Sequence, residues 1–225
     1  MTTLETLPPI DAEGGLYRER AVEPTRTALL SIDMQNMECA AELRRRARQG
    51  GANDGEKAYF HDRLERIVIP NQQRLLAAAR ARGVEVIFTV IESLTLDGRD
   101  RSLDHKISRL HAPKGSWEAK VIDELGPRGD EIVIPKTSSG IFNSTNVDYV
   151  LRNLGIEYLV MFGALTDQCV ESAIRDAADR GFMVTEVEDG CATYTPERHE
   201  ASIRAMGGHY CRTRSTDEMI AEFDR

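Results

Sequence analysis

The chain has 225 residues, of which 41% are hydrophobic and 29% are charged, an ordinary composition for a folded globular protein. The 37 acidic residues outnumber the 29 basic ones, and a net charge of −8 argues against nucleic acid or an anionic membrane as a partner. No segment is apolar over the length of a bilayer-spanning helix, and the first residues lack the basic-then-apolar layout of a signal peptide.

The four cysteines lie far apart in the sequence, and none belongs to a Cys-x-x-Cys pair. This spacing predicts neither a disulfide framework nor a zinc knuckle, and it favours a reducing, cytoplasmic location. In such a compartment a single well-placed cysteine is able to act as a catalyst. The four positions are Cys39, Cys169, Cys191 and Cys211.

The chain begins with a polar, proline-containing stretch at 1–26, which we expect to be a surface arm in front of one domain at 27–225. Within that domain, short apolar runs bounded by turn residues predict six strands. Apolar residues at helical spacing, with glycines after several of the segments, predict helices between the strands. The predicted strands span 27–33, 84–90, 131–134, 158–162, 182–187 and a short piece near residue 210, and the predicted helices span 62–82, 146–153, 168–180, 196–206 and the residues from 216.

Two long segments are less regular. Residues 38–62 are charged and contain the run Gln49-Gly-Gly51, which predicts a surface excursion with some helix before it. Residues 92–130 are charge-rich, with a helical piece predicted near 117–125. Elsewhere strands alternate with helices. We therefore expect a three-layer α/β fold, in which helices cover both faces of a six-stranded, mostly parallel sheet.

Chemically useful side chains follow several of the predicted strands. Asp33 ends the first strand, Glu92 follows the second and Lys136 follows the third, and a turn leads from the fourth strand to Cys169. In sheets of this kind, ligands bind outside the carboxyl ends of the strands. We therefore expect an acid, a lysine and a cysteine to converge on one edge of the sheet.

This convergence would serve nucleophilic attack on an amide. Cys169 is predicted at the start of a helix, where backbone N–H groups and the helix dipole lower the pKa of a thiol. Asp33 is placed to take the thiol proton, and Lys136 to hold Asp33 ionised or to stabilise the thiolate. The turn at 163–168 would direct backbone N–H groups towards an oxyanion. Each residue alone has a structural explanation, as a buried cysteine, a capping acid or a solvated lysine, but their combination favours catalysis.

Three motifs together resemble the isochorismatase-like cysteine hydrolase superfamily over about residues 25–215. The resemblance implies a catalytic triad of Asp33, Lys136 and Cys169. It also implies a cis peptide bond between Ala164 and Leu165, so that the backbone N–H groups of Leu165 and Cys169 form the oxyanion hole. The motifs are Ala28-Leu-Leu-Ser-Ile-Asp-Met-Gln-Asn36, Ile134-Pro-Lys-Thr-Ser-Ser-Gly-Ile-Phe142 and Gly163-Ala-Leu-Thr-Asp-Gln-Cys-Val-Glu-Ser172.

Members of this superfamily differ in their chemistry. Isochorismatases proper lack the nucleophilic cysteine, so Cys169 argues against that activity. Nicotinamidases share the triad but bind a metal through an acid and histidines soon after the first aspartate, whereas here no histidine precedes His61. We therefore expect no metal and no other cofactor. The chain looks more similar to ureidoacrylate and N-carbamoyl amidohydrolases, particularly in its Lys114-Gly-Ser-Trp117 piece.

Five further residues are candidates for substrate binding. Two of them directly follow the Asp33 strand, one follows the second strand, one is an aromatic expected to form an apolar wall, and one lies on the turn before the cysteine. The five are Gln35, Asn36, Glu92, Phe142 and Ala164.

One of these candidates bears on specificity. A carboxylate at Glu92 would prefer a substrate end that carries N–H groups or positive charge. The histidines at 105 and 111 are not among the candidates, because they lie in a charged loop, where a lone histidine is expected to be solvated.

The sequence thus predicts an enzyme that hydrolyses a C–N bond in a small amide, ureido or carbamoyl compound through a covalent acyl-enzyme at Cys169. Two alternatives remain open: a nicotinamidase-like amidase of the same fold, and a catalytically silent subunit that only binds. The expected partner is the small-molecule substrate, and the resemblance implies a homodimer or homotetramer. The acyl group and the leaving amine depend on the loops at 36–62 and 92–117.

Overall fold

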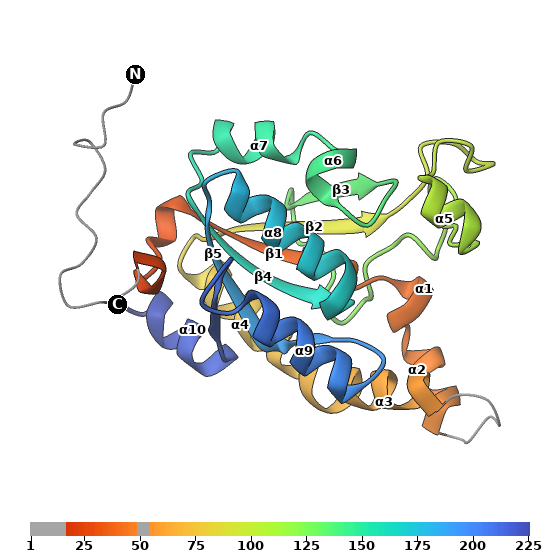
Figure 1. Ribbon diagram of the computed structural model, residues 1–225, viewed down its shortest axis with the longest axis horizontal. Coiled ribbons are helices and arrows are strands. Elements are labelled where there is room, and N and C mark those ends of the chain that lie inside the picture. Colours follow the sequence, from red (N-terminus) through yellow and green to blue (C-terminus); the bar gives the residue numbers. More distant parts are fainter. Residues whose placement is uncertain (1–16, 49–54) are drawn as a thin grey trace.

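The computed structural model describes residues 17–48 and 55–225 (Figure 1). The first sixteen residues of the predicted surface arm, and the whole Gln49-Gly-Gly51 run, lie outside the described residues. The remainder of the arm forms two short 3-10 turns, η2 (Tyr17–Glu19) and η3 (Pro24–Arg26), which lead directly into the first strand.

Six strands form one sheet with the order β3-β2-β1-β4-β5-β6, and every neighbouring pair is parallel. The predicted six-stranded α/β fold is therefore confirmed, and the sheet is parallel throughout. The strands are β1 (Thr27–Ile32), β2 (Glu85–Ile91), β3 (Ile132–Lys136), β4 (Tyr158–Ala164), β5 (Met183–Ala192) and β6 (Arg212–Arg214).

Helices occupy the connections, largely where helical spacing predicts them. The long helix predicted at 62–82 begins earlier and contains a π-helical turn, and a second π-helical turn precedes the helix that follows β4. The helical elements are α1 (Asn36–Cys39), α2 (Ala41–Arg48), α3 (Gly55–Arg63), η4 (Leu64–Val68), α4 (Ile69–Ala81), α5 (Leu103–Ile107), α6 (Ile141–Ser144), α7 (Val147–Asn153), η5 (Thr166–Val170), α8 (Glu171–Asp179), α9 (Pro196–Met206) and α10 (Thr216–Phe223). Within the described ranges, no helix is long and apolar enough to cross a membrane.

The helix predicted near 117–125 is wrong. This segment instead lies beside the residues that follow β1 and exchanges backbone hydrogen bonds with them. The N–H of Asn36 donates to Lys120 O at 2.9 Å, and the N–H of Ile122 donates to Met34 O at 3.0 Å. Because its backbone groups are satisfied by a distant segment, this stretch stays extended and turned rather than helical.

The direction of the chain through the sheet sets which helices cover which face. From β1 the chain passes through α3 and α4 to β2 on one side, whereas from β4 it passes through α8 to β5 on the other side. Both crossovers are right-handed, as is usual between parallel strands, but they run in opposite directions along the sheet. For this reason α4 and α8 cover opposite faces. α10 packs beside α4, and α6 packs beside α8 (Figure 1).

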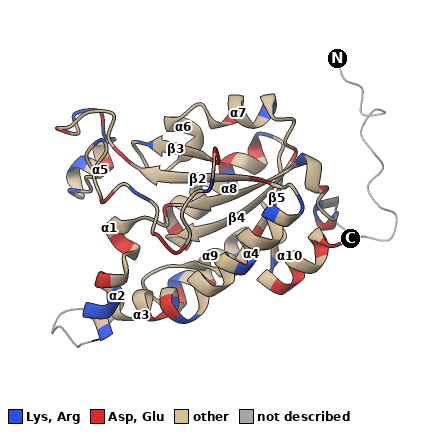
Figure 2. Cartoon of the chain, turned by 180° about the vertical axis from the view of Figure 1, so that it is seen from behind, with Lys and Arg blue, Asp and Glu red and all other residues tan. Residues whose placement is uncertain are grey.

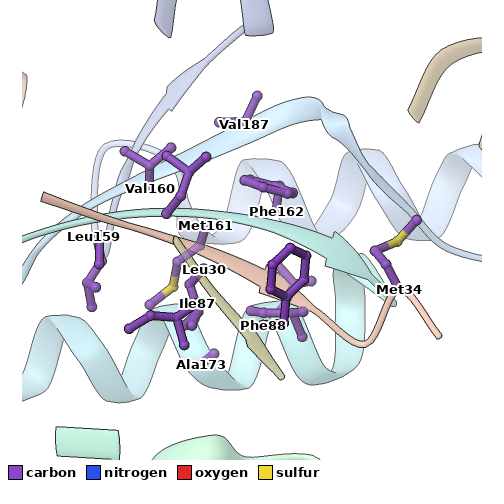
Figure 3. Packing of buried hydrophobic residues seen from close by; sticks show 14 of the residues in the cluster. Leu30, Met34, Ile87, Phe88, Leu159, Val160, Met161, Phe162, Ala173 and Val187 are labelled. Atoms are coloured by element: carbon purple, nitrogen blue, oxygen red, sulfur yellow. The ribbon is translucent and has the colours of Figure 1, made fainter. Parts of the chain in front are cut away.

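The central strands β1 and β4 are buried along their whole length, as expected for strands with helices on both faces. In Figure 3, Val160 and Phe162 of β4 point to one side of the sheet, and Leu159 points to the other, towards Ala173 of α8. This alternation gives two apolar layers, one on each face of the sheet.

The carboxyl ends of β1 and β4 pair at a glycine. Gly163 on β4 pairs with Ile32 of β1 and has φ +137°. A Cβ atom at this position would lie 2.1 Å from the carbonyl oxygen of Ile32, closer than any real Cβ contact. Only glycine permits this approach, which brings the segment after β4 against the end of β1.

We predict that Gly163→Ala destabilises the fold by about 2–4 kcal/mol, because the methyl group forces the two central strands apart. Gly126→Ala is the matched control, since a Cβ there would meet its nearest atom at 3.6 Å, which is an ordinary contact. This control is expected to change the free energy of unfolding by less than about 0.5 kcal/mol. Urea unfolding of both variants measures the difference, and equal stabilities would contradict the steric argument.

Candidate active site

Three side chains from different strand ends meet in a buried cluster. The ammonium of Lys136, the last residue of β3, lies 2.8 Å from Oδ2 of Asp33 and 3.3 Å from Sγ of Cys169. Its third contact is the carbonyl oxygen of Ser138, at 3.0 Å. The structure thus brings together the acid, the lysine and the cysteine that the sequence places at the edge of the sheet. They lie on the side where α1 and α5 are found (Figure 1).

Asp33 is held by the end of β2. Its backbone N–H donates to the carbonyl oxygen of Thr89 at 3.1 Å, and the Thr89 hydroxyl donates to Asp33 Oδ1 at 2.9 Å. Asp33 has φ +53°, a left-handed conformation that aspartate tolerates better than most residues. The chain thereby turns sharply after β1, while one carboxylate oxygen is fixed by Thr89 and the other faces Lys136.

Lys136 has no solvent exposure, so its charge depends on its partners. Burial alone would lower the pKa of the ammonium, but Asp33 and Cys169 outweigh that effect and raise it above its usual value. The side chain therefore remains protonated at neutral pH. It provides a fixed positive charge beside the thiol.

Cys169 lies in η5, two residues before α8 begins, close to the helix start that the sequence predicts. The expected low thiol pKa is wrong. Burial raises the pKa of Cys169 to about 12, Lys136 lowers it only in part, and Asp33 raises it further. Desolvation of the thiolate therefore outweighs the helix start, and at neutral pH the resting cysteine is a thiol.

The turn that carries Cys169 is held in place by a contact with α9. Its peptide bond between Ala164 and Leu165 is cis, as the family resemblance implies. The Thr166 hydroxyl lies 2.9 Å from Nδ1 of His199 on α9, and Nε2 of that histidine lies 3.0 Å from an Arg63 guanidinium nitrogen. Burial and Arg63 lower the pKa of His199 to about 4. The histidine is therefore neutral at physiological pH and able to accept from Arg63.

Sequence reasoning did not identify this supporting network. Asp167, the next residue of the turn, accepts from the Thr193 hydroxyl and from the guanidinium of Arg198. Thr193 follows β5, and Arg198 lies on α9. No local pattern marks these partners, because each contact joins residues at least 26 positions apart.

A cavity of about 320 Å³ opens beside the cysteine. Its lining comes from the turn after β4, from the residues that follow β1 and from α5 with its neighbouring loop. The lining residues are Asp33, Gln35, Met37, Glu38, Ile91, Asp104, His105, Ser108, Leu110, Ser139, Ala164, Leu165, Gln168, Cys169 and Tyr194.

Two of the five substrate-binding candidates, Gln35 and Ala164, line this cavity. The amide of Gln35 is already engaged in the fold. Its Nε2 donates to the carbonyl oxygens of Ile91 and Glu118, each at 3.0 Å, and its Oε1 accepts from the Ile91 N–H at 2.7 Å. Gln35 thus ties the turn after β1 to β2 and to the 117–125 segment, which shapes the cavity wall.

The other three candidates lie outside the cavity lining. Asn36 is buried and donates from Nδ2 to the carbonyl oxygen of Trp117 at 3.0 Å. Glu92 accepts from the Gly115 N–H at 2.6 Å and lines a separate surface hollow. Phe142 of α6 packs against Phe182, with the ring centroids 6.1 Å apart. Each of these side chains is used in holding the fold, so the expected contacts with substrate do not follow from their positions.

The histidine expected to be solvated is instead part of the site. His105 is buried on α5 and lines the cavity, with its neighbour Asp104. The only sequence signal was Ser102, whose side chain accepts from the His105 N–H at 3.2 Å and so caps α5. A capping serine predicts a helix start, but it does not say which way that helix faces.

Comparisons with known proteins point to one family. A family model for the isochorismatase domain matches residues 27–218. The chain is 35% identical to ureidoacrylate amidohydrolase RutB from Pantoea ananatis, over 77% of this chain and 72% of that protein. It is 33% identical to the protein of the same name from Agrobacterium fabrum, over 78% and 80% respectively. The chain belongs to the isochorismatase family.

Solved structures of isochorismatase-family proteins share the fold. A cysteine hydrolase from Pseudomonas syringae superposes with a TM-score of 0.76 at 22% identity, covering 97% of this chain and 98% of that one. N-carbamoylsarcosine amidase from Thermoplasma acidophilum superposes with a TM-score of 0.64 at 25% identity, covering 85% and 97%. An Asp-Lys-Cys triad is typical of this family, and this member has the three residues in contact.

The charged neighbours of Cys169 should control the pKa of its thiol, and alkylation rates can test this. We predict that Asp33→Asn lowers the thiol pKa, because it removes a negative charge that raises it, and that Lys136→Met raises the pKa further. Alkylation by iodoacetamide at fixed pH should therefore be faster in the first variant and slower in the second. Each unit of pKa change alters the rate by about tenfold, because only the thiolate reacts.

Peptide mapping after brief alkylation provides the internal control. Cys39, Cys191 and Cys211 are fully buried, so Cys169 at 6% exposure should be labelled first in the native enzyme. Equal rates of Cys169 labelling in all three proteins, or slower labelling in Asp33→Asn, would contradict the assigned electrostatics.

Proposed function

We propose that this chain is a cysteine-dependent amidohydrolase that cleaves a C–N bond in a small ureido, carbamoyl or amide compound. The observation that carries this conclusion is the contact of Lys136 with both Asp33 and Cys169 at the wall of one cavity. The names of its relatives, a ureidoacrylate amidohydrolase and an N-carbamoylsarcosine amidase, support the same reaction class.

The reaction follows from the charges in the site. Asp33 accepts the thiol proton as Sγ of Cys169 attacks the substrate carbonyl carbon, and Lys136 stabilises both the carboxylate and the forming thiolate. The C–S bond forms as the carbonyl π pair moves to oxygen. When the intermediate collapses, the C–N bond breaks and the nitrogen takes the proton from Asp33, so that ammonia or an amine leaves. Water then attacks the thioester, transfers its proton through Asp33, and releases the acid and the thiol.

The oxyanion of each tetrahedral intermediate needs donors. We assign this role to the backbone N–H groups of Leu165 and Cys169, which belong to the turn that lines the cavity. The contacts of Thr166 with His199 and of Asp167 with Arg198 hold this turn from the opposite side. In this arrangement the donors are fixed before the substrate arrives, which is what makes such a hole effective.

We further propose a cytoplasmic homo-oligomer, a dimer or tetramer. The four cysteines are free thiols, which suits a reducing compartment. Several large apolar side chains around α5 are exposed, including Leu96, Leu103 and Ile107, each more than 70% accessible. Exposed apolar groups gathered in one region are typical of subunit contacts.

We predict that Cys169→Ser lowers kcat by at least about a thousandfold with an unchanged melting temperature, because a hydroxyl is a far poorer nucleophile in a site built for a thiol. The measurement is ammonia release over a panel of ureido, carbamoyl, primary amide and nicotinamide compounds. Cys211→Ala is the matched control, since this buried cysteine lies outside the cavity lining and should keep full activity. A serine variant with more than about a tenth of the activity would remove Cys169 from the nucleophile role.

The nicotinamidase-like alternative makes a different prediction about metal. Among the described residues, no group of three or more histidine, cysteine, aspartate or glutamate side chains is arranged to hold a metal ion. We expect activity to survive dialysis against a chelator, with less than about 0.1 transition-metal atom per subunit by elemental analysis, because structural and catalytic metal sites of this kind need three or more such ligands. One metal per subunit and loss of turnover on chelation would favour the nicotinamidase-like alternative instead. An active-site thiol that is alkylated without any substrate turnover would favour the silent subunit.

A further inference from the structure

The charged residues among the described lining of the cavity are all acidic, apart from the titratable His105. Three carboxylates, Asp33, Glu38 and Asp104, line it, and no lysine or arginine appears among its described lining residues. Asp33 is already neutralised by the Lys136 ammonium. Glu38 on α1 and Asp104 on α5 remain as the charged groups that face a ligand. Figure 2 shows acidic positions on both of these short helices, which lie at the same end of the sheet.

Neither of these two carboxylates has an ion-pair partner among the described residues. The nearest cations in the sequence do not line the cavity. Lys106 and Arg109, which flank the lining residue Ser108, are both exposed and absent from the lining. The ammonium of Lys136 is fully buried and already has three partners. The cavity therefore presents uncompensated negative charge.

A third group points to a ligand independently of this charge. His105 is only 1% exposed, and both ring nitrogens lack a hydrogen-bond partner among the described residues. Burial, together with the nearby charge of Lys136, lowers the pKa of His105, so the ring is neutral at physiological pH. A neutral imidazole offers one donor and one acceptor, and leaving both unused inside a protein is costly. A bound molecule in the cavity that His105 lines would satisfy them.

We infer that the cavity binds an N-carbamoylated amine whose other end carries a cationic amino group, with Glu38 and Asp104 as partners of that cation and His105 as a hydrogen-bonding wall. This inference rests on the proposed hydrolysis at Cys169 and specifies its substrate class. It separates this chain from its relatives, because ureidoacrylate carries a carboxylate at its other end. Two carboxylates at the cavity would repel that group and attract an ammonium in its place.

The test compares three compounds of equal chain length: (aminobutyl)urea, butylurea and ureidobutanoate. They share the ureido group on a four-carbon chain, which ends in an ammonium, a methyl group or a carboxylate, so that their net charges are plus one, zero and minus one. We expect kcat/KM to fall in that order, by at least about tenfold at each step, which corresponds to about 1.4 kcal/mol. The double variant Glu38→Gln with Asp104→Asn should bring the three values within about threefold of one another, because it removes the charge and keeps the shape.

Asp123→Asn is the matched control, since it removes one exposed carboxylate that lines the separate hollow rather than this cavity, and it should keep the original order. His105→Leu should raise KM for all three compounds and leave their order intact. Preferred turnover of ureidobutanoate, or an order unaffected by the double variant, would overturn the inference. The first result would mean that a cation such as Arg109 reaches the ligand.

Binding measurements distinguish a failure of this inference from a failure of the proposed reaction. Calorimetric titration of the Cys169→Ser variant with (aminobutyl)urea and ureidobutanoate reports the charge preference without turnover. If no ureido compound is hydrolysed but (aminobutyl)urea binds at least about tenfold more tightly, the reaction class fails and the charge preference stands. If the three compounds are hydrolysed and bind equally, the reaction class stands and the charge preference fails.

Discussion

The buried ion pair between Lys136 and Asp33 is the constraint on which the site depends. An ammonium without solvent exposure is stable only when its charge and its three N–H donors are all satisfied. Here the partners are the Asp33 carboxylate, the Ser138 carbonyl and the Cys169 sulfur, from three different parts of the chain. Removing one partner leaves a buried group unpaired, so the ends of β1 and β3 and the turn after β4 have to stay together.

The order of the strands makes this meeting possible. The chain winds outwards from β1 to β3 in one direction and from β4 to β6 in the other, so β1 and β4 are neighbours at the point where the direction reverses. Ligands bind outside the carboxyl ends of strands at such points, where the connecting segments diverge and leave a crevice. Asp33 and Cys169 lie on the two sides of this crevice, and Lys136 reaches it across the end of β2. Gly163 lets the two strand ends approach closely enough for contact.

The same burial explains the resting state of the thiol. A desolvated thiolate is unfavourable, so Cys169 stays protonated until a substrate arrives and Asp33 accepts the proton. The low dielectric that raises this pKa also strengthens each charge interaction within the site. Reactivity is therefore supplied by fixed neighbours rather than by a permanently ionised cysteine. The chemistry of the substrate, in turn, is set by α1 and α5, which carry Glu38, Asp104 and His105 and are not part of the sheet.

The sequence alone predicted the six strands and the convergence of Asp33, Lys136 and Cys169 at one edge of the sheet. Apolar runs such as 27–33 and 158–162 mark buried parallel strands, and the residues at their carboxyl ends necessarily meet at one edge of the sheet. These conclusions need only local periodicity and the geometry of parallel strands.

Only the tertiary structure decided the path of the 117–125 segment, the orientation of α5 and the thiol pKa. The backbone of 117–125 pairs with residues 34–37, which overrides its local helical pattern. His105 is buried, whereas Glu92 is held by Gly115 away from the cavity, although both lie in the same charged stretch of sequence. Burial and loop pairing arise from contacts between distant residues, and hydrophobic spacing along the chain does not encode them.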